Sequence, residues 1–446
     1  MRNALLPWLL CLTLPGALGG EEPHAKGHPA PPPDSWPAWR GPLANGVAPG
    51  GDPPLEWSES KNVVWKSPLP GLGHSTPIVW GDRIFLTTAV PFGEAIPPIE
   101  SKAPGAHDNI PVTHRQRFVA LAVSRDEGRI LWETALREAL PLEGGHRTAS
   151  LASASAVTDG EMVFVPFGSY GLYALDTDGK VLWQKDFGPM QILHGHGEGS
   201  SPVLHGDVLA LNWDHEGESF IAALDKKTGK ELWKAPRREV TSWATPLVVE
   251  HGGKTQLVVS GTSRVRGYDL GTGAILWECG GLSANIVASP VAGDGMVFVG
   301  SSYDTRALLG IRLDGARGDI TGTDRVAWRR SRGTPYVPSP LLHDGALYFL
   351  AHYQGILTRV DAKTGEERPG AIRLEGIGDV YASPVAAAGR IYVTDLQGMT
   401  AVVEHGEAPR VIARNLLDDS FSASAAIAGR EMFLRGRKSL YCIAGR

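Results

Sequence analysis

Cysteine is scarce in this sequence, which has three cysteines among its 446 residues. Cys11 lies near the N-terminus, so the rest of the chain keeps Cys279 and Cys442. Two cysteines cannot build the disulfide framework of a small secreted scaffold. No Cys-x-x-Cys-His motif is present either, which excludes covalent haem attachment of that type. We therefore expect two partly buried thiols in different parts of the fold.

The chain also lacks an excess of positive charge. Its formal net charge is −5 at pH 7, whereas a nucleic-acid-binding surface needs a stripe of Lys and Arg residues. We therefore expect no nucleic-acid partner.

Long apolar runs are missing as well. The mostly apolar run at the N-terminus, Ala4 to Leu14, is too short to cross a bilayer, which takes about 20 apolar residues. Arg2 precedes this run and the small residues of Ala17-Leu18-Gly19 follow it, which is typical of a secretory signal. We predict a signal peptide over residues 1–19, a flexible leader over 20–35, and a periplasmic or extracellular product without a transmembrane segment.

Glycine, in contrast, is abundant, at 55 residues, and many tight turns between short strands would explain this. A small hydroxyl residue followed by Pro or Ala recurs eight times, and after the first interval the copies are 41 to 50 residues apart. Units of about 45 residues with four short strands have the size of a propeller blade, and β-helix rungs are shorter. The hydroxyl residues are Thr76, Ser155, Ser201, Thr245, Ser289, Ser339, Ser383 and Ser424.

A second motif ends most units. Its best copy runs from Ala223 to Trp233, where Asp225 and Gly229 mark a turn before an outer strand that contains the Trp. A large aromatic at a fixed place suits a joint between units, because its ring covers apolar area while its N–H finds a partner. The alternative is a Trp that packs within its own sheet. The predicted blade-docking residues are Trp65, Trp132, Trp183, Trp233, Trp277 and Trp328.

The ends of the chain predict how the ring closes. The eighth unit stops after Ser439 to Ile443 without an outer strand, whereas Asn62 to Lys66 has the sequence of such a strand. An N-terminal strand that completes the last blade would remove an open edge. We therefore predict one all-β domain over residues 36–446, an eight-bladed β-propeller of four-stranded antiparallel blades, and a monomer.

The repeat Ala-x-Asp-x-x-Thr-Gly-x-x-x-Trp resembles the tryptophan-docking repeat of the PQQ-like (quinoprotein-type) β-propeller family. The opening Trp36 to Pro42 is similar to the start of many exported bacterial members of that family. The family includes quinoprotein alcohol and sugar dehydrogenases, and also non-catalytic members such as an outer-membrane assembly lipoprotein. The repeats depart from the pattern at Pro369, which stands in place of the Trp, in the repeat around 401–411, and in an insertion between Leu313 and Trp328. We expect those blades to pack more loosely or to use other residues at the joint.

Catalytic signatures of the family are not found. Its alcohol dehydrogenases carry a vicinal Cys-Cys disulfide over PQQ, with Glu, Asn and Asp ligands for calcium, and neither feature can be matched to this sequence. A Gly-x-Ser-x-Gly elbow is absent too. We therefore expect no catalytic residue and no cofactor, with PQQ and calcium as the alternative, although the sequence does not settle whether the protein is an enzyme.

Histidines are the unusual feature. His74, His146, His194 and His196 lie directly ahead of predicted innermost strands, and Glu198 follows the last pair. In a propeller such connections surround one mouth of the central channel. Two of the histidines with Glu198 could hold a metal ion, or all five side chains could line a wet polar funnel.

An insertion from about Pro91 to Arg117 interrupts the first unit. A loop of this length is usually functional or mobile, so it could form a lid, offer a binding face or be disordered. We interpret the chain as a non-catalytic exported scaffold or assembly factor that presents loops to a protein partner. The rival is a quinoprotein-type oxidoreductase or small-ligand binder with a site at the channel mouth.

Overall fold

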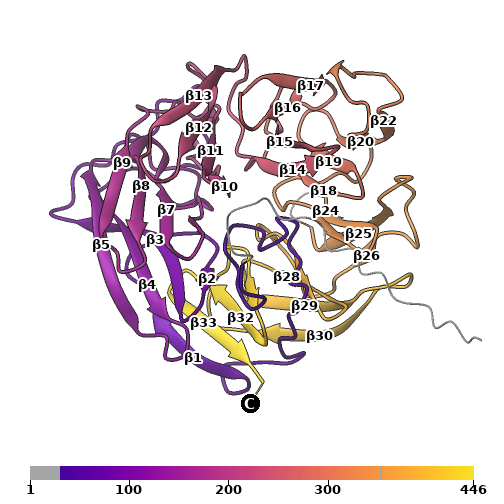
Figure 1. Cartoon of the computed structure of the whole chain (residues 1–446). Coiled ribbons are helices and arrows are strands. Elements are labelled where there is room, and N and C mark those ends of the chain that lie inside the picture. Colours follow the sequence, from indigo (N-terminus) through magenta and orange to yellow (C-terminus); the bar gives the residue numbers. More distant parts are fainter. Residues whose placement is uncertain (1–30, 352–353, 446) are drawn as a thin grey trace, which may run out of the picture. The chain divides into compact units, whose positions relative to one another are not determined.

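The computed structural model describes residues 31–351 and 354–445. The predicted signal peptide lies outside the described residues, and of the predicted leader residues 31–35 are described. The strands form eight separate sheets that follow one another around a ring (Figure 1). Each sheet has four antiparallel strands, and one gains a fifth, parallel strand. The prediction of an all-β, eight-bladed propeller is confirmed.

We number the blades in chain order. Blade 1 consists of β2 (Ile78–Trp80), β3 (Arg83–Phe92), β4 (Arg115–Ser124) and β5 (Ile130–Ala139). Blade 2 consists of β6 (Val157–Thr158), β7 (Met162–Pro166), β8 (Leu172–Asp176) and β9 (Val181–Lys185). Blade 3 consists of β10 (Val203–His205), β11 (Val208–Trp213), β12 (Phe220–Asp225) and β13 (Glu231–Pro236). Blade 4 consists of β14 (Leu247–His251), β15 (Lys254–Val259), β16 (Val265–Asp269), β17 (Ile275–Cys279) and the added β21 (Gly318–Asp319).

The second half of the ring follows the same order. Blade 5 consists of β18 (Val291–Gly293), β19 (Met296–Ser301), β20 (Ala307–Arg312) and β22 (Val326–Arg330). Blade 6 consists of β23 (Leu341–His343), β24 (Ala346–Leu350), β25 (Ile356–Asp361) and β26 (Ile372–Arg373). Blade 7 consists of β27 (Val385–Ala387), β28 (Arg390–Thr394), β29 (Met399–Glu404) and β30 (Arg410–Leu416). Blade 8 consists of β31 (Ala426–Ala428), β32 (Glu431–Arg435), β33 (Ser439–Ala444) and β1 (Val63–Pro68).

Helical structure is limited to two short 3-10 turns, η1 (Gly168–Tyr170) and η2 (Leu193–Gly195), in the described part of the chain. No helix among these residues has the length and apolar character that a membrane crossing requires.

The ring closes as the sequence predicts. Strand β1 pairs antiparallel with β33, so that Trp65 lies opposite Cys442 and Pro68 opposite Ser439. The Trp65 ring also lies 6.0 Å from the Phe433 ring, centroid to centroid. The first strand of the domain therefore completes the last blade.

The hydroxyl residues of the recurring motif link neighbouring blades. The Thr76 N–H donates to Ser155 Oγ, and the Ser155 N–H donates to Ser201 Oγ, both at 2.9 Å. Five further bonds of this kind continue the series to Ser424, and we call the eight residues the hydroxyl belt. At the eighth joint, Thr76 Oγ1 has no hydrogen-bond partner among the described residues, and Arg435 donates to Ser75 Oγ instead. The motif repeats because each hydroxyl from Ser155 to Ser424 accepts a buried N–H from the preceding blade.

Five of the six predicted docking tryptophans make the same joint. Each indole N–H donates, at 2.8 to 3.0 Å, to a carbonyl in a turn of the next blade. A positive-φ Gly in that turn lies against the ring, where an added Cβ would come within 2.5 to 2.7 Å of ring atoms. Glycine is therefore needed because the backbone there has a positive φ and because a side chain would collide with the indole ring. The five residues are Trp65, Trp132, Trp183, Trp233 and Trp328.

Trp277 differs from the other five. Its N–H donates to Gln256 Oε1 at 2.8 Å within its own sheet. The predicted insertion after Leu313 replaces the short turn of blade 5, and its strand β21 pairs with β17 so that Gly318 lies opposite Trp277. The ring remains fully buried and packs in one apolar cluster with Leu309 of blade 5. Trp277 thus keeps the apolar part of the joint while its N–H binds within blade 4.

The last joints depart from the motif as well. Blade 6 has Pro369 in place of the docking Trp, and its outer strand β26 is two residues long. Between blades 7 and 8, the ring of Trp57 from the N-terminal segment lies 6.2 Å from the Tyr392 ring, centroid to centroid. Trp57 belongs to the apolar cluster that the two blades share. A residue from outside the repeats therefore covers that joint.

The two cysteines of the domain are free and lie in different blades. Cys279 belongs to β17 and Cys442 to β33, and both are fully buried instead of partly exposed. Burial raises the pKa of both thiols, so neither is primed for reaction.

Candidate functional site

The N-terminal segment crosses one end of the central channel. Trp36 exchanges two backbone hydrogen bonds with Val79 on the inner edge of β2, at 2.8 and 2.9 Å. Val47 bridges in parallel to Ala386 on the inner edge of β27. We call residues 36–48 the plug. The innermost strands end on the side of the ring where the plug lies. The plug therefore occupies the far end of the channel, and the residues that precede the innermost strands surround the opposite end, the mouth.

Arg40 anchors the plug. Its guanidinium donates to Pro384 O at 2.6 Å, to Pro340 O at 2.7 Å and to Asn45 O at 2.8 Å. The side chain is buried, and burial lowers the pKa of Arg40 to about 9. The two proline carbonyls belong to blades 6 and 7, so one side chain joins the plug to two blades.

A cavity of about 480 Å³ lies in the channel. Seven of the eight hydroxyl-belt residues line it, from Ser155 to Ser424. Aromatic side chains line it as well, and the rings of Tyr303 and Tyr336 stack with centroids 6.3 Å apart. The other aromatic lining residues are Trp39, Trp243 and Tyr381.

The structure brings the predicted mouth residues to this one cavity. His74, His146, His194, His196 and Glu198 all line it. The ring centroids of His146 and His196 are 4.8 Å apart, and those of His194 and His196 are 5.3 Å apart. The five side chains thus share one cavity, and their chemical role stays a prediction.

His107 joins this group from the predicted insertion. Its ring lies 4.7 Å from that of His196 and 5.0 Å from that of His194, centroid to centroid. Sequence reasoning did not select His107, although the pair His107-Asp108 within a long insertion was a visible signal.

The loop between β3 and β4 folds over the mouth. The Ile110 N–H donates to Gly145 O at 2.9 Å, and the Arg147 N–H donates to Asp108 O at 2.8 Å. Asn109 Nδ2 donates to His194 O at 2.9 Å. Of the three alternatives for the insertion, these contacts with the loops ahead of blades 2 and 3 favour the lid.

The imidazoles of His196 and His74 are neutral near pH 7. Burial, then the neighbouring imidazoles of His146 and His107, lower the pKa of His196 to about 4. Burial, with Arg435 and Arg437 nearby, lowers the pKa of His74 to about 3. These rings can therefore donate and accept hydrogen bonds, or bind a metal, without first losing a proton.

Glu198 forms hydrogen bonds with Ser169 of η1. The Ser169 N–H donates to Glu198 Oε2 at 2.8 Å, and the Ser169 hydroxyl donates to Oε1. Burial raises the pKa of the Glu198 carboxyl to about 7, although the bonds from Ser169 oppose this shift. Both oxygens are thus engaged by the neighbouring turn.

This raised pKa predicts a specific dependence of stability on pH. The pKa of Glu198 in the fold exceeds the ordinary value of 4.5, so its stabilising contribution is complete below pH 4.5 and is lost as the pH rises through 7. Glu198→Gln copies the protonated form. We expect the variant to match wild type near pH 4.5 and to be more stable at pH 8, by on the order of 2 kcal/mol.

The measurement is the melting temperature of both proteins between pH 4.5 and 8. Glu161→Gln, at an exposed position between β6 and β7 of blade 2, is the control and should give no such trend. A constant difference between Glu198→Gln and wild type across this range would contradict the assignment.

The mouth histidines do not converge on one point as metal ligands would. Among the described residues, the group of three whose ligand atoms all lie within 4.8 Å of one another is His343, Asp344 and His405. This group lies in blades 6 and 7, away from the predicted site.

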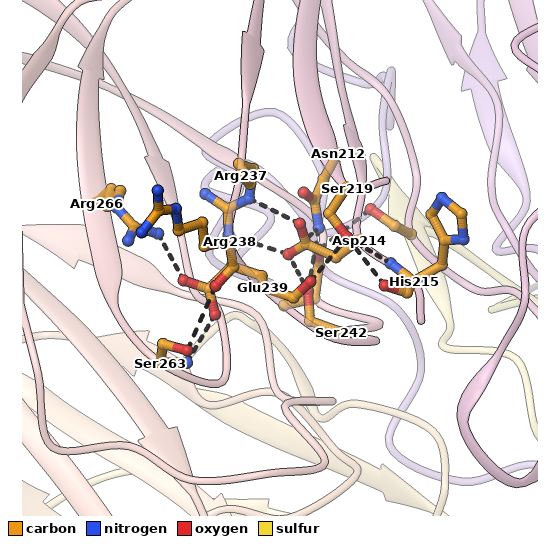
Figure 2. Close-up of polar contacts among 12 residues, drawn as sticks. Asn212, Asp214, His215, Ser219, Arg237, Arg238, Glu239, Ser242, Ser263 and Arg266 are labelled. Atoms are coloured by element: carbon orange, nitrogen blue, oxygen red, sulfur yellow. Dashed lines mark hydrogen bonds and ion pairs between the residues drawn. The ribbon is translucent and has the colours of Figure 1, made fainter. Parts of the chain in front are cut away.

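A buried polar network stands behind the cavity wall (Figure 2). Asp214 accepts from Arg237 Nε at 2.7 Å, from Arg237 Nη2 at 3.0 Å and from Ser242 Oγ at 2.7 Å. Next along the chain, Trp243 lines the cavity and its indole N–H donates to Gly197 O at 2.7 Å. The network therefore fixes the segment that positions Trp243, and no repeat motif in the sequence pointed to it.

Comparison with known proteins supports the fold. A family model described as outer membrane protein assembly factor BamB matches residues 50–212 and 217–444. No curated protein matches the chain in sequence.

Several solved structures are similar in architecture. BamB from Moraxella catarrhalis is 14% identical, with a TM-score of 0.52 over 80% of this chain and 99% of that one. The quinohemoprotein alcohol dehydrogenase from Comamonas testosteroni is 9% identical, with a TM-score of 0.59 over 93% and 81% of the two chains. The computationally designed Ika8 protein is 13% identical, with a TM-score of 0.53 over 85% and 99%. At these identities the likeness concerns the fold alone.

Proposed function

The chain belongs to the PQQ-like β-propeller family whose model is described as outer membrane protein assembly factor BamB, and from that premise we propose that it binds a small uncharged, polyhydroxylated ligand, such as a mono- or disaccharide, in the channel cavity. The observation that carries the proposal is a cavity of about 480 Å³ between the plug and the lid. Ligand pockets of soluble proteins have volumes of about 300–1,000 Å³. The predicted signal over residues 1–19 favours an extracytoplasmic place of action.

The chemistry of the lining supports a neutral polar ligand. Each belt hydroxyl that accepts an N–H from the preceding blade keeps its own hydrogen for a second partner, so the cavity offers a ring of O–H donors. The neutral imidazoles of His146 and His196 add donors and acceptors. The stacked Tyr303 and Tyr336 rings offer flat apolar faces for the C–H groups of a sugar ring.

PQQ with calcium fits this lining poorly. PQQ carries three carboxylates. The permanently charged cation among the cavity-lining residues is Arg147, whose exposed side chain already lies 3.7 Å from Asp108, Nε to Oδ1. Calcium takes six to eight oxygen ligands, and both Glu198 oxygens are bonded to Ser169. We therefore derive no step that uses PQQ and propose a binding protein without that cofactor.

Ligand binding can be tested by thermal shift and calorimetry with a panel of neutral mono- and disaccharides, beside PQQ with Ca²⁺. A ligand specific for the folded state raises the melting temperature, so we expect a rise with at least one sugar and none with PQQ.

Tyr303→Ala should weaken sugar binding about tenfold, which corresponds to about 1.4 kcal/mol, because it removes one flat face. Its side chain is 52% exposed, so the fold should tolerate the change.

Leu416→Ala, at an exposed site on the outer strand of blade 7, is the matched control and should bind as wild type does. A rise in melting temperature with PQQ and Ca²⁺, followed by dye-linked alcohol or sugar oxidation, would replace this proposal with a quinoprotein oxidoreductase.

A protein-interaction scaffold is the second candidate function. The fourth strands β9, β13 and β17 of three consecutive blades carry exposed apolar side chains, of which Leu182 is 46%, Leu232 50% and Ile275 53% exposed. Strands β9 and β13 end their sheets, so their edges also present backbone groups that can pair with another chain. These exposed apolar side chains support a protein partner, and so does the description of the family model as an assembly factor.

A further inference from the structure

We propose that His343, Asp344 and His405 bind a divalent transition-metal ion such as Zn²⁺ at the joint between blades 6 and 7. The ligand atoms of these three side chains lie within 4.8 Å of one another. Asp344 Oδ2 is 3.4 Å from His405 Nε2 and 3.8 Å from His343 Nε2. In a tetrahedral zinc site with bonds of about 2.0–2.1 Å, neighbouring ligand atoms are about 3.3–3.4 Å apart. The two imidazole ligand atoms also lie within 4.8 Å of each other, so shifts of up to about 1.5 Å would complete the site.

The backbone holds the three ligands in place. His343 ends β23, and Asp344 with Gly345 forms the two-residue turn to β24, with φ of 46° and 69°. His405 follows β29, and its N–H donates to Gly389 O, in the turn between β27 and β28, at 2.8 Å. All three residues thus sit at the ends of hairpins on the far side of the ring, where strand pairing limits their movement.

The partners of the two imidazoles fit metal binding. His343 Nε2 is buried and has no hydrogen-bond partner among the described residues, so an ion would satisfy a group that otherwise costs stability. His405 Nδ1 lies 2.9 Å from the Tyr348 hydroxyl. A histidine that binds a metal through Nε2 commonly donates its other N–H to such a group. The Arg359 Nε–H also donates to the Tyr348 oxygen, at 3.2 Å, so the phenol separates that cation from the ligands.

The donor set selects the class of ion. Two imidazole nitrogens and one carboxylate suit Zn²⁺, Co²⁺, Ni²⁺ or Cu²⁺, whereas Mg²⁺ and Ca²⁺ prefer oxygen donors. Asp344 is 71% exposed at its side chain, so solvent can supply the fourth ligand.

The position of the site suggests what the ion does. At this joint the docking tryptophan is replaced by Pro369, and the outer strand β26 of blade 6 has two residues. The proposed ligands come from both blades, so a bound ion would fasten the joint that lacks the usual indole contact. This role is independent of the ligand proposed for the channel.

The test uses the full chain after removal of any affinity tag and treatment with a chelator. We expect Zn²⁺ to bind at about one equivalent in equilibrium dialysis and to raise the melting temperature by about 2–5 °C. Co²⁺ should give visible absorption bands from a site with nitrogen and oxygen ligands. The double variant His343→Ala/His405→Ala should lose the stoichiometric binding and the bands.

Two further variants make the outcome decisive. Asp344→Asn keeps the turn, because Asn tolerates the left-handed backbone there, and it should weaken binding at least tenfold without loss of folding. His146→Ala/His196→Ala at the channel mouth should leave the Co²⁺ bands unchanged. Bands that disappear in the mouth variant and persist in the blade 6–7 variant, or the absence of stoichiometric binding by wild type, would overturn the proposal.

Discussion

A chain that begins at Leu69 is expected to fail to give a soluble monomer. It lacks β1, so β33 becomes an open edge with unpaired N–H and C=O groups, the kind of edge that promotes association. It also loses the plug, whose Arg40 caps the carbonyls of Pro340 and Pro384 in two blades. We expect the yield of monomer in gel filtration to fall at least tenfold, because ring closure and the filled far end disappear together.

The control for this truncation is a chain that begins at Pro31, which keeps every described contact of β1 and the plug. It should elute as a monomer and melt in one cooperative transition. A third protein, the full-length Arg40→Ala variant, isolates the plug. The buried carbonyls of Pro340 and Pro384 and the partly buried carbonyl of Asn45 lose their donor, which we expect to cost about 3–5 kcal/mol. A soluble, cooperatively folded chain from Leu69 onward would show that β1 is dispensable and that closure does not depend on it.

The blade count could be predicted because its signal is local and repeated. From Ser155 to Ser424, each Ser or Thr of the belt meets the same need, since it accepts the N–H of the corresponding residue one blade earlier. The docking of Trp132 and Trp233 follows in the same way, because a ring and a turn at fixed offsets must meet once the blades pack side by side. The departure of Trp277 shows the limit, because an insertion in the next blade removed the turn that the ring would have met.

The site was predictable only where it depends on the repeat. His146, His194 and His196 were found because each precedes an innermost strand, and the ring brings those positions to one mouth. His107 comes from an insertion whose path no repeat specifies. His343 and His405 are 62 positions apart and meet because a turn of blade 6 lies beside a different turn of blade 7. Their contact depends on side-chain directions at a joint, which spacing along the chain does not encode.

Replacement of either member of the Asp214–Arg237 pair is expected to lower the free energy of unfolding by an amount that is large for a single substitution. Both side chains are fully buried, and two bonds of 2.7 and 3.0 Å join them. Arg237→Met would leave the Asp214 carboxylate with donors from Ser242 and Asn212 and no counter-charge. Breaking a buried ion pair by removing one partner costs about 3–5 kcal/mol, because the other charge stays buried.

A double-mutant cycle distinguishes the pair from simple loss of packing. Asp214→Asn and Arg237→Met should each lower the free energy of unfolding in urea by about 3–5 kcal/mol, whereas the double variant should lose clearly less than the sum. Arg264→Ala is the matched control, because its pair with Asp319 at 2.8 Å is solvent-exposed and should contribute less than about 1 kcal/mol. Fluorescence from Trp243, which follows Ser242 in the network, should change in the Asp214 and Arg237 variants and not in Arg264→Ala. Strictly additive losses would mean that other neighbours stabilise the two charges separately, and that the wall of the cavity does not depend on their pairing.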